Sequence, residues 1–325
     1  MKKIAALLFA AAFVLGLCSC SGGNGGKDAD KTYTVGICQL TQHPALDAAT
    51  DGFKAALTEK LGDKVSFDEK NASNDSTACS TIVNGFVSKN VDLILANATP
   101  ALQAAASATT EIPILGTSVT EYGVALKIDD FNGTVGGNIS GTSDLAPLDE
   151  QAAMVKELVP TAKKVGLVYC SAEQNSLYQV NTVKDELSKL GIDGELYPFS
   201  DSNDIASVVT AACGTCDALY VPTDNTAASS AGIIDSVARE KKIPVIAGEE
   251  GICKGCGIAT LTISYYDIGY RTGEMAAQIL TGEKKISEMP IEYAPKFVKK
   301  YNAEICSELG ITVPDDYEKT DTSAE

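Results

Sequence analysis

The sequence predicts an α/β protein with two lobes, each built on a doubly wound parallel sheet, joined by a hinge of several segments. Three observations lead to this prediction. Apolar, β-favouring segments alternate with helical patterns, the segments of the first half recur in the same order in the second half, and polar clusters follow the strand-like segments. Strands that alternate with helices in this way favour a parallel sheet with helices on both faces.

The first residues predict export. Lys2 and Lys3 precede an apolar run, residues 4–17, that is shorter than the roughly 20 residues needed to span a bilayer. This pattern is typical of a signal peptide, which we place at residues 1–19. Cys20 follows the small residue Ser19 in a context that resembles a bacterial lipobox, although Cys18 is unusual at its position, and we expect Cys20 to be lipidated. Residues 20–31, which are rich in glycine, then form a flexible leash.

The composition suits a two-domain body. About 290 residues follow the leash, and 45% of the chain is hydrophobic, which is enough for two cores. Without Lys2 and Lys3 the chain holds 24 basic and 43 acidic residues, a net charge of −19. This charge argues against nucleic acid or anionic lipid as a partner.

Each half begins with a strand and a helix. Residues 34–38 precede a helical pattern that runs to Leu61, and residues 165–170 precede one that runs to Leu190. Three further pairs of predicted strands match between the halves: 91–96 with 217–222, 112–116 with 243–248, and 123–128 with 257–263. The internal repeat predicts two lobes of one plan.

A helix is also predicted after the last strand of each half. The segment beginning at Ser143 predicts a helix through Leu158, and Tyr266 begins one through Leu280. If each of these helices belongs to the other lobe, the chain crosses between the lobes more than once. We therefore assign residues 32–142 and about 265–300 to the N-terminal lobe, and 143–264 and about 301–318 to the C-terminal lobe.

Polar clusters lie where the predicted strands end. In open parallel sheets, ligands bind beyond the carboxyl ends of the strands, where helix N-termini also lie. Two lobes that face each other through these ends enclose a polar cleft. The clusters are residues 39–43, 97–99, 117–120, 171–176, 223–226 and 249–250.

The sequence offers little catalytic chemistry. His43 is the single histidine, no Walker or GxGxxG loop opens a helix, and no metal-binding histidine pair is present, so we expect a protein without a cofactor that is not an enzyme. The strongest enzymatic alternative is a cofactor-independent amino-acid racemase, since Cys38 and Cys170 end equivalent strands. A cysteine in such a place is more often a small buried apolar residue.

Two CxxC pairs, at residues 213–216 and 253–256, each precede a strand on the side away from the polar clusters. Four such thiols could bind zinc, but an exported protein favours local disulfides or free thiols, and we expect no metal.

The chain resembles the substrate-binding lipoproteins of ABC transporters of the tryptophan/tyrosine type. The resemblance spans essentially the whole mature chain, and Cys38, the CxxC pairs and Tyr122 depart from it. It implies a type I periplasmic-binding-protein fold that closes over an aromatic or related apolar amino acid. The motifs that carry it are QLTQHPALD (39–47), NATP (97–100), SGTSD (140–144), EQNS (173–176), VPTDN (221–225), SYYDIG (264–269) and YNAEICSELGITVP (301–314).

An amino-acid zwitterion buried between lobes needs hydrogen-bond donors for its carboxylate and a counter-charge for its ammonium. Hydroxyl donors are Thr99, Ser118, Thr120 and Ser143. Asp224 is the first choice for the counter-charge, although it could instead cap a helix; Glu173 is a further candidate, and Asp144 is expected to cap the helix near Pro147. His43 could cap its helix or contact the ligand, and Tyr266 or Tyr178 could stack on a ring or belong to the core. The other candidates are Asn97, Asn175, Ser176, Asn225 and Glu249.

The resemblance also implies a membrane permease as partner and a position on the outer face of the cytoplasmic membrane, or on its periplasmic side in a Gram-negative cell. We expect a monomer. A tethered sensor, read by a receptor in place of a permease, is an alternative that sequence does not separate.

Overall fold

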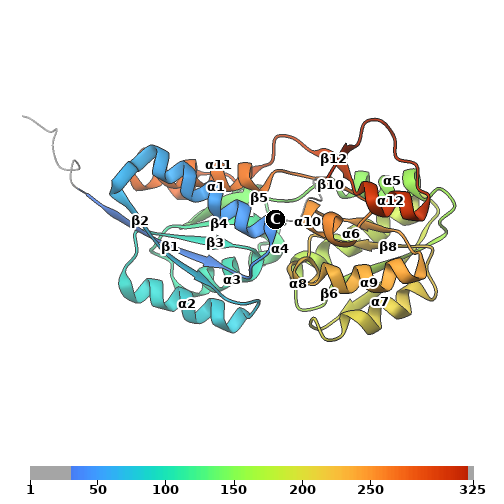
Figure 1. Cartoon of the computed structure of the whole chain (residues 1–325). Helices are drawn as coiled ribbons and strands as arrows, with labels where there is room; N and C mark the ends of the chain where they lie inside the picture. The colour runs from blue at the N-terminus through green and yellow to red at the C-terminus, as the bar shows by residue number, and fades with distance from the viewer. Residues whose placement is uncertain (1–30, 321–325) are drawn as a thin grey trace, which may run out of the picture. The chain divides into compact units, whose positions relative to one another are not determined.

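The computed structural model describes residues 31–320 of the chain, and the predicted signal peptide and Cys20 lie outside this range. Two sheets organise the described residues, with helices on both faces of each (Figure 1). The strand order is β11-β5-β4-β3-β1-β2 in one sheet and β13-β12-β10-β9-β8-β6-β7 in the other. The pairings are parallel except for β10 with β12, which is antiparallel. The predicted fold class is confirmed.

The N-terminal lobe contains the first sheet. Its elements are β1 (Tyr33–Gln39), α1 (Pro44–Leu61), η1 (Gly62–Lys64), β2 (Val65–Asn71), α2 (Ser76–Lys89), β3 (Leu93–Asn97), α3 (Thr99–Ala108), β4 (Ile114–Val119), α4 (Tyr122–Leu126), β5 (Ile139–Ser143), α11 (Tyr265–Leu280), η2 (Ile286–Glu288) and β11 (Glu292–Tyr293).

The C-terminal lobe contains the second sheet. Its elements are α5 (Leu148–Leu158), β6 (Lys164–Cys170), α6 (Gln174–Lys189), β7 (Asp193–Phe199), α7 (Ile205–Cys213), β8 (Ala218–Val221), α8 (Asn225–Ser229), α9 (Ala231–Lys241), β9 (Val245–Ala247), α10 (Glu250–Cys256), β10 (Ala259–Thr262), β12 (Val298–Tyr301), α12 (Ala303–Leu309) and β13 (Glu318–Lys319).

The chain crosses between the sheets three times in the described residues. The crossings lie between β5 and α5, between β10 and α11, and between β11 and β12. The return to the second sheet therefore falls between Tyr293 and Val298. These three connecting segments form the hinge between the lobes.

Both faces of each sheet are buried, so the strands carry apolar residues in continuous runs. In β6, Val165 and Leu167 pack against the helices of one face, and Val168 packs against those of the other. Phe53 of α1 is fully buried on the first sheet beside Met275 of α11. Full burial of a side chain of this size contributes about 1.5–3 kcal/mol to stability.

The prediction of a strand at 123–128 is wrong. These residues form α4, because the Glu121 carboxylate accepts a hydrogen bond from the Val124 N–H and Lys127 ends the helix in the left-handed region at φ 56°. The strand equivalent to β10 is β5, which follows a loop after α4.

The helix predicted through Leu158 is present and ends at that residue, but it does not begin at Ser143. Ser143 is the last residue of β5, and α5 begins five residues later at Leu148. Pro147 occupies the N-cap position without a side-chain hydrogen bond, so Asp144 does not cap this helix. Its carboxyl group is therefore free for another role.

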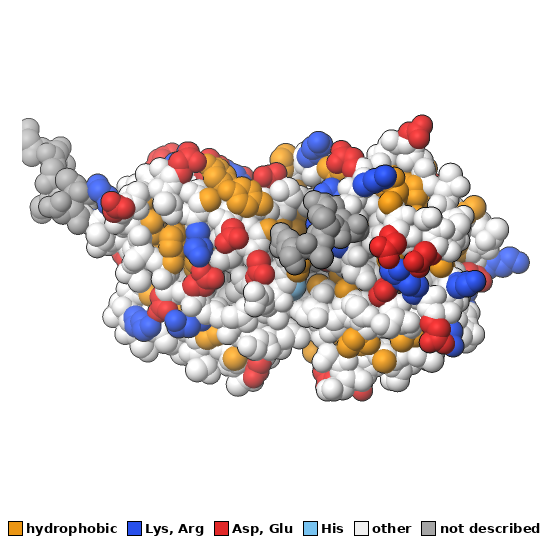
Figure 2. Space-filling view, viewed as in Figure 1, with side chains coloured by type: hydrophobic (Ala, Val, Ile, Leu, Met, Phe, Trp, Pro, Cys, Tyr) orange, Lys and Arg blue, Asp and Glu red, His pale blue; other side chains and the backbone are white. Residues whose placement is uncertain are grey.

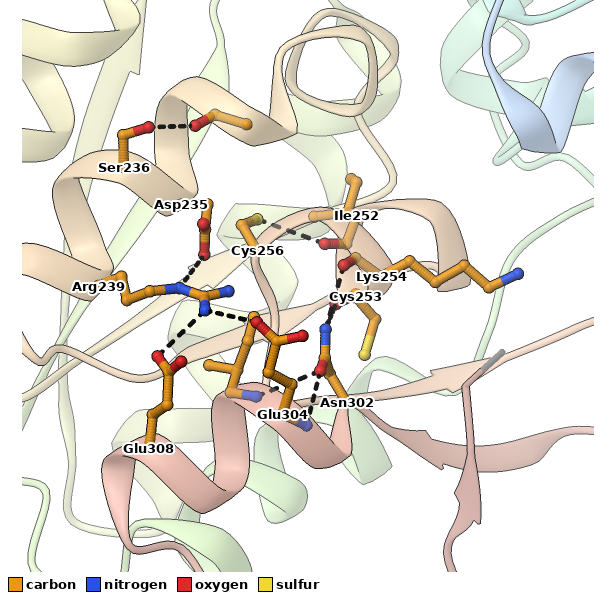
Figure 3. A network of polar contacts seen from close by, with 12 residues as sticks. Asp235, Ser236, Arg239, Ile252, Cys253, Lys254, Cys256, Asn302, Glu304 and Glu308 are labelled. Carbon is orange, nitrogen blue, oxygen red and sulfur yellow. Dashed lines mark hydrogen bonds and ion pairs between the residues drawn. The ribbon is translucent and has the colours of Figure 1, made fainter. Parts of the chain in front are cut away.

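The C-terminal segment is fixed to the second sheet by α12. The Asn302 side chain accepts hydrogen bonds from the N–H groups of Glu304 and Ile305, and Arg239 of α9 pairs with Glu304 and Glu308 (Figure 3). On the face shown in Figure 2, basic and acidic side chains are interspersed over both lobes. Such mixed charge on the surface favours solubility.

Candidate functional site

A narrow cavity lies between the lobes, beyond the carboxyl ends of the strands. Residues that follow β1, β4, β5, β6, β8, β9 and β10 line it, so both sheets contribute. The lining residues are His43, Leu46, Ser118, Thr120, Asp144, Asn175, Thr223, Asp224, Asn225, Ala228, Glu249 and Tyr265.

The backbone aims Ser118 into the cavity at some conformational cost. Ser118 has φ 53°, and the pairing of β4 with β5 shifts register between Gly116 and Val119. A non-glycine residue in the left-handed region is uncommon and costs about 1–3 kcal/mol. The bulge directs the Ser118 hydroxyl, which has no hydrogen-bond partner in the described residues, toward the ligand space.

Asp144 follows β5 directly and is 4% exposed. Its Oδ2 accepts a hydrogen bond from the Tyr265 hydroxyl at 3.0 Å, and its Oδ1 has no partner in the described residues. Burial raises the pKa of this carboxyl to about 6, although Thr120 and Tyr265 lower it through hydrogen bonds. A buried carboxylate oxygen without a donor is costly, so it is a natural acceptor for a cationic group.

Asp224 has both oxygens occupied by backbone groups. One accepts from the Cys170 N–H at 2.7 Å, and the other accepts from the Ala227 N–H at 2.8 Å and caps α8. Burial and the nearby Glu173 carboxylate raise the pKa of Asp224. Glu249 likewise caps α10 by accepting from the N–H groups of Gly251 and Ile252, and burial raises its pKa.

Glu173 is buried, and its carboxylate accepts from five donors. Oε2 accepts from the Asn225 N–H, the Asn225 side-chain amide and the Asn175 side-chain amide. Oε1 accepts from the Thr226 N–H and the Thr226 hydroxyl. The group therefore joins α6 to the first turn of α8.

Four buried side-chain atoms of cavity residues have no hydrogen-bond partner in the described residues. They are His43 Nδ1, Ser118 Oγ, Asp144 Oδ1 and Asn175 Oδ1. Buried polar groups in native proteins are almost always hydrogen-bonded. Four such atoms around one cavity therefore indicate a polar ligand, and two of them, the Asp144 and Asn175 oxygens, can only accept.

Acidic side chains outnumber basic ones around the cavity. Asp144, Asp224 and Glu249 line it, and no lysine or arginine is among its lining residues. A ligand therefore meets carboxyl groups together with neutral donors, which favours a cationic group such as an ammonium over an isolated anion.

Several predicted residues are buried nearby but do not line the cavity. Asn97 donates to the Leu46 carbonyl and to Thr50, and the Ser143 hydroxyl donates to the Thr120 carbonyl. Thr99 is the first residue of α3, and Ser176 accepts from the Asn175 amide. These groups lie in the segments next to the cavity and do not face it.

The aromatic candidates lie elsewhere. Tyr266 is 45% exposed and stacks on Tyr270 with ring centroids 6.3 Å apart, and Tyr178 is half-buried outside the cavity. Tyr266 lines a neighbouring hollow, which shares Glu249 and Tyr265 with the cavity and has largely apolar walls that include Pro44, Ala45 and Val298.

Tyr265, Thr223, Leu46 and Ala228 line the cavity and were missed by sequence reasoning. Thr223 and Tyr265 lie inside the motifs VPTDN and SYYDIG, so the motifs gave the segments but not the residues that face the ligand. Leu46 lies inside the motif QLTQHPALD in the same way, whereas no sequence pattern marked Ala228; both lie in the first turn of their helices.

The cysteines of the described residues lie outside the cavity. Cys38 is fully buried and hydrogen-bonded to Cys79, and Cys170 contacts the Ser200 carbonyl at 3.6 Å. Cys253 and Cys256 are buried beside Asn302 (Figure 3), and the eight cysteines of this part of the chain are free. Residues 31–320 hold no group of three or more potential metal ligands. In the same range no helix is long and apolar enough to cross a membrane.

Two lobes that enclose a polar cavity lined from both sides define a solute-binding protein of the clam-shell type. The comparisons with known proteins specify the family. Residues 34–324 match the family of ABC transporter substrate binding proteins, and the chain belongs to it. Its fold is that of the type I periplasmic binding proteins, and it is a binding protein and not an enzyme.

A tyrosine-binding protein of Clostridioides difficile (strain R20291) is 39% identical over 307 residues, which cover 89% of this chain and 87% of that protein. A domain from Streptococcus pneumoniae solved in complex with L-Trp is 33% identical, with a TM-score of 0.84 and coverage of 88% and 97%. The ligand-free, open structure of a Clostridium difficile substrate binding protein is 38% identical, with a TM-score of 0.69 and coverage of 90% and 100%.

The order of these TM-scores is opposite to the order of sequence identity. This chain is more similar in structure to the L-Trp complex than to the open structure, although its sequence is closer to the latter.

Proposed function

We propose that this chain is the extracytoplasmic ligand-binding lipoprotein of an ABC importer and that it carries an aromatic or related apolar amino acid. The single observation behind the proposal is the set of unpartnered buried atoms, with the acceptors Asp144 Oδ1 and Asn175 Oδ1 and the donor Ser118 Oγ around one cavity. An α-ammonium donates to the first two, and an α-carboxylate accepts from the third.

The lining of the cavity supports a small ligand that is part polar and part apolar. Leu46, Ala228 and the ring of Tyr265 supply apolar surface beside the polar atoms. The names of the two relatives above, one a tyrosine-binding protein and one an L-Trp complex, support an aromatic ligand.

A thermal-shift screen of the 20 amino acids tests the ligand class. An aromatic amino acid at about 100 times its Kd should stabilise the protein by roughly 2.7 kcal/mol if it binds only the folded state. Tyramine, which lacks the carboxylate, is the matched probe, because Ser118→Ala should weaken tyrosine binding while changing tyramine binding little. Shifts with sugars or inorganic anions and none with any amino acid would contradict the proposal.

The anchor and the transporter need tests of their own. Cys20 lies outside the described residues, and its context in the sequence supports lipidation. Labelled palmitate should enter the wild type and the Cys18→Ser control but not Cys20→Ser. Capture of a membrane permease by the ligand-loaded protein supports the importer role, whereas capture of a receptor alone would favour a sensor.

A further inference from the structure

Two hydrogen bonds cross the cleft from adjacent residues of α8. Asn225 Oδ1 lies 3.3 Å from His43 Nε2, and Thr226 Oγ1 accepts from the Asn74 side-chain amide at 3.0 Å. His43 and Asn74 belong to the N-terminal lobe, and Asn225 and Thr226 belong to the C-terminal lobe. Both contacts therefore depend on closure of the lobes.

Glu173 holds both of the C-terminal partners. Its carboxylate accepts from the Asn225 Nδ2 at 2.6 Å and from the Thr226 hydroxyl at 2.8 Å. A carboxylate has no hydrogen to donate, so the Asn225 amide must turn its Nδ2 inward and its Oδ1 toward the cleft. For the same reason the Thr226 hydrogen points inward and an oxygen lone pair faces the cleft.

This arrangement fixes the tautomer of His43. An amide oxygen only accepts, so the hydrogen between His43 Nε2 and Asn225 Oδ1 must be on the histidine. In the neutral ring, Nδ1 then carries no hydrogen and is an acceptor. Nδ1 is buried without a partner in the described residues and belongs to a residue that lines the cavity.

We propose that Glu173 is a positioning residue that sets the donor–acceptor polarity of the closed cleft. It makes the C-terminal lobe accept and the N-terminal lobe donate, and it presents His43 Nδ1 as an acceptor beside Asp144 Oδ1 and Asn175 Oδ1. Three acceptors match the three hydrogens of a primary ammonium. The ammonium assignment rests on the proposed function, whereas the polarity across the cleft does not.

Substitutions at Asn74 test the polarity. Asn74 has φ 63°, which glycine and aspartate both tolerate. Asn74→Gly removes the donor, whereas Asn74→Asp places an acceptor against the Thr226 oxygen. Asn74→Asp should therefore weaken L-tyrosine binding about three- to tenfold more than Asn74→Gly, the range for one hydrogen bond. Small-angle X-ray scattering of the ligand-free variants should show that Asn74→Asp populates an open arrangement of the lobes more than Asn74→Gly does.

Repeating the two Asn74 substitutions in Glu173→Gln and in Thr226→Val separates the effect of hydrogen-bond direction from that of charge repulsion between the introduced aspartate and Glu173. In Glu173→Gln the Thr226 hydroxyl is free to donate to an aspartate, so the difference between the Asn74 variants should shrink or reverse. In Thr226→Val the hydroxyl is absent while Glu173 keeps its charge, so the two Asn74 variants should become equal. Thr226→Ser is the control that retains the hydroxyl and the difference. A difference that persists in Thr226→Val reflects long-range repulsion and overturns the proposal, and this test stands even if Glu173→Gln does not fold.

His43 gives a readout that needs no ligand. It is the single histidine of the chain, so its ring nitrogens give one unambiguous set of ¹⁵N resonances. With the ring neutral and under conditions in which scattering shows the lobes closed, the wild type should show the Nε2–H tautomer, and Glu173→Gln should show a population of Nδ1–H. The Nδ1–H tautomer in the wild type would overturn the inference. A correct tautomer without any amino-acid binding would instead contradict only the proposed ligand.

Discussion

The Tyr265 hydroxyl donates a hydrogen bond to Asp144 Oδ2 at 3.0 Å. The two residues are 121 positions apart, and each lies in a segment that crosses between the lobes, Asp144 after β5 and Tyr265 at the start of α11. The carboxyl group that faces the cavity is thus held by the hinge itself.

Tyr265→Phe should weaken binding of the cognate amino acid by about 1.5–3 kcal/mol, the contribution of a hydrogen bond to a charged group. The reason is that Asp144 Oδ2 loses the Tyr265 hydroxyl as a hydrogen-bond donor in a buried site. Isothermal titration measures the change. Tyr266→Phe is the matched control, since that residue is 45% exposed outside the cavity, and an equal loss in both variants would contradict the assigned role.

Asp144→Asn should mainly lower ligand affinity, whereas Asp224→Asn should mainly lower the stability of the fold. Asp144 has a free oxygen toward the cavity, so its substitution should cost about 1.5–3 kcal/mol of affinity and little stability. Asp224 accepts two backbone N–H groups, so its substitution should lower the melting temperature, with a smaller loss of affinity. Ligand titrations and melting curves of the ligand-free variants measure the two effects. A larger affinity loss for Asp224→Asn than for Asp144→Asn would show that Asp224 is the counter-charge of the ligand ammonium.

Ligand affinity should fall at acidic pH. Burial raises the pKa of Asp144 from 3.8 to about 6 in the unliganded protein, and a bound ammonium favours the ionised form. Affinity is therefore full above about pH 6 and should decrease by up to about tenfold per pH unit below it. Because His43, Asp224 and Glu249 also line the cavity, the diagnostic quantity is the difference between wild type and Asp144→Asn.

The same shift acts on the unliganded fold in the opposite direction. A carboxyl whose pKa is raised on folding contributes stability that is complete below pH 3.8 and is lost as the pH rises through about 6. Ligand-free melting temperatures of wild type and Asp144→Asn should differ more at pH 7 than at pH 4. A pH-independent difference would show that Asp144 does not titrate in this range.

Gly269→Ala should destabilise the N-terminal lobe by about 3 kcal/mol or more. Helices α1 and α11 approach so closely that a methyl group at Gly269 would lie 2.0 Å from the Ala49 carbonyl oxygen. Overpacking against backbone cannot be relieved by a rotamer change. Gly232→Ala on the exposed face of α9, where the new methyl group meets nothing within 4 Å, is the control and should stabilise by roughly 0.5–1 kcal/mol. Chemical denaturation measures both, and equal effects would contradict the close packing of α1 and α11.

The sequence predicted which segments of the chain line the cavity, but not which side chains within them face it. The clusters after β1, β4, β6, β8 and β9 line the cavity, because parallel strands end at one edge of a sheet whatever their side chains are. Which side chain within a cluster faces the ligand depends on local backbone turns. Ser118 faces the cavity because of a bulge, and Thr99, at the exit of β3, does not line it.

The fold class, the internal repeat and the strand ends that carry the polar residues follow from the sequence alone, because strand and helix periodicities and turn residues are local properties of the chain. The roles of the acidic residues depend on tertiary packing. From the sequence, Asp224 could be the counter-charge or a helix cap, and Asp144 is expected to be a cap. In the structure, backbone N–H groups from β6 and α8 occupy Asp224, which caps α8, while one Asp144 oxygen accepts no hydrogen bond from the described residues. The difference depends on which groups 54 or 121 residues away are brought within hydrogen-bond distance. No local sequence pattern encodes these long-range contacts, because they form only when the chain has packed into two sheets connected by a three-segment hinge.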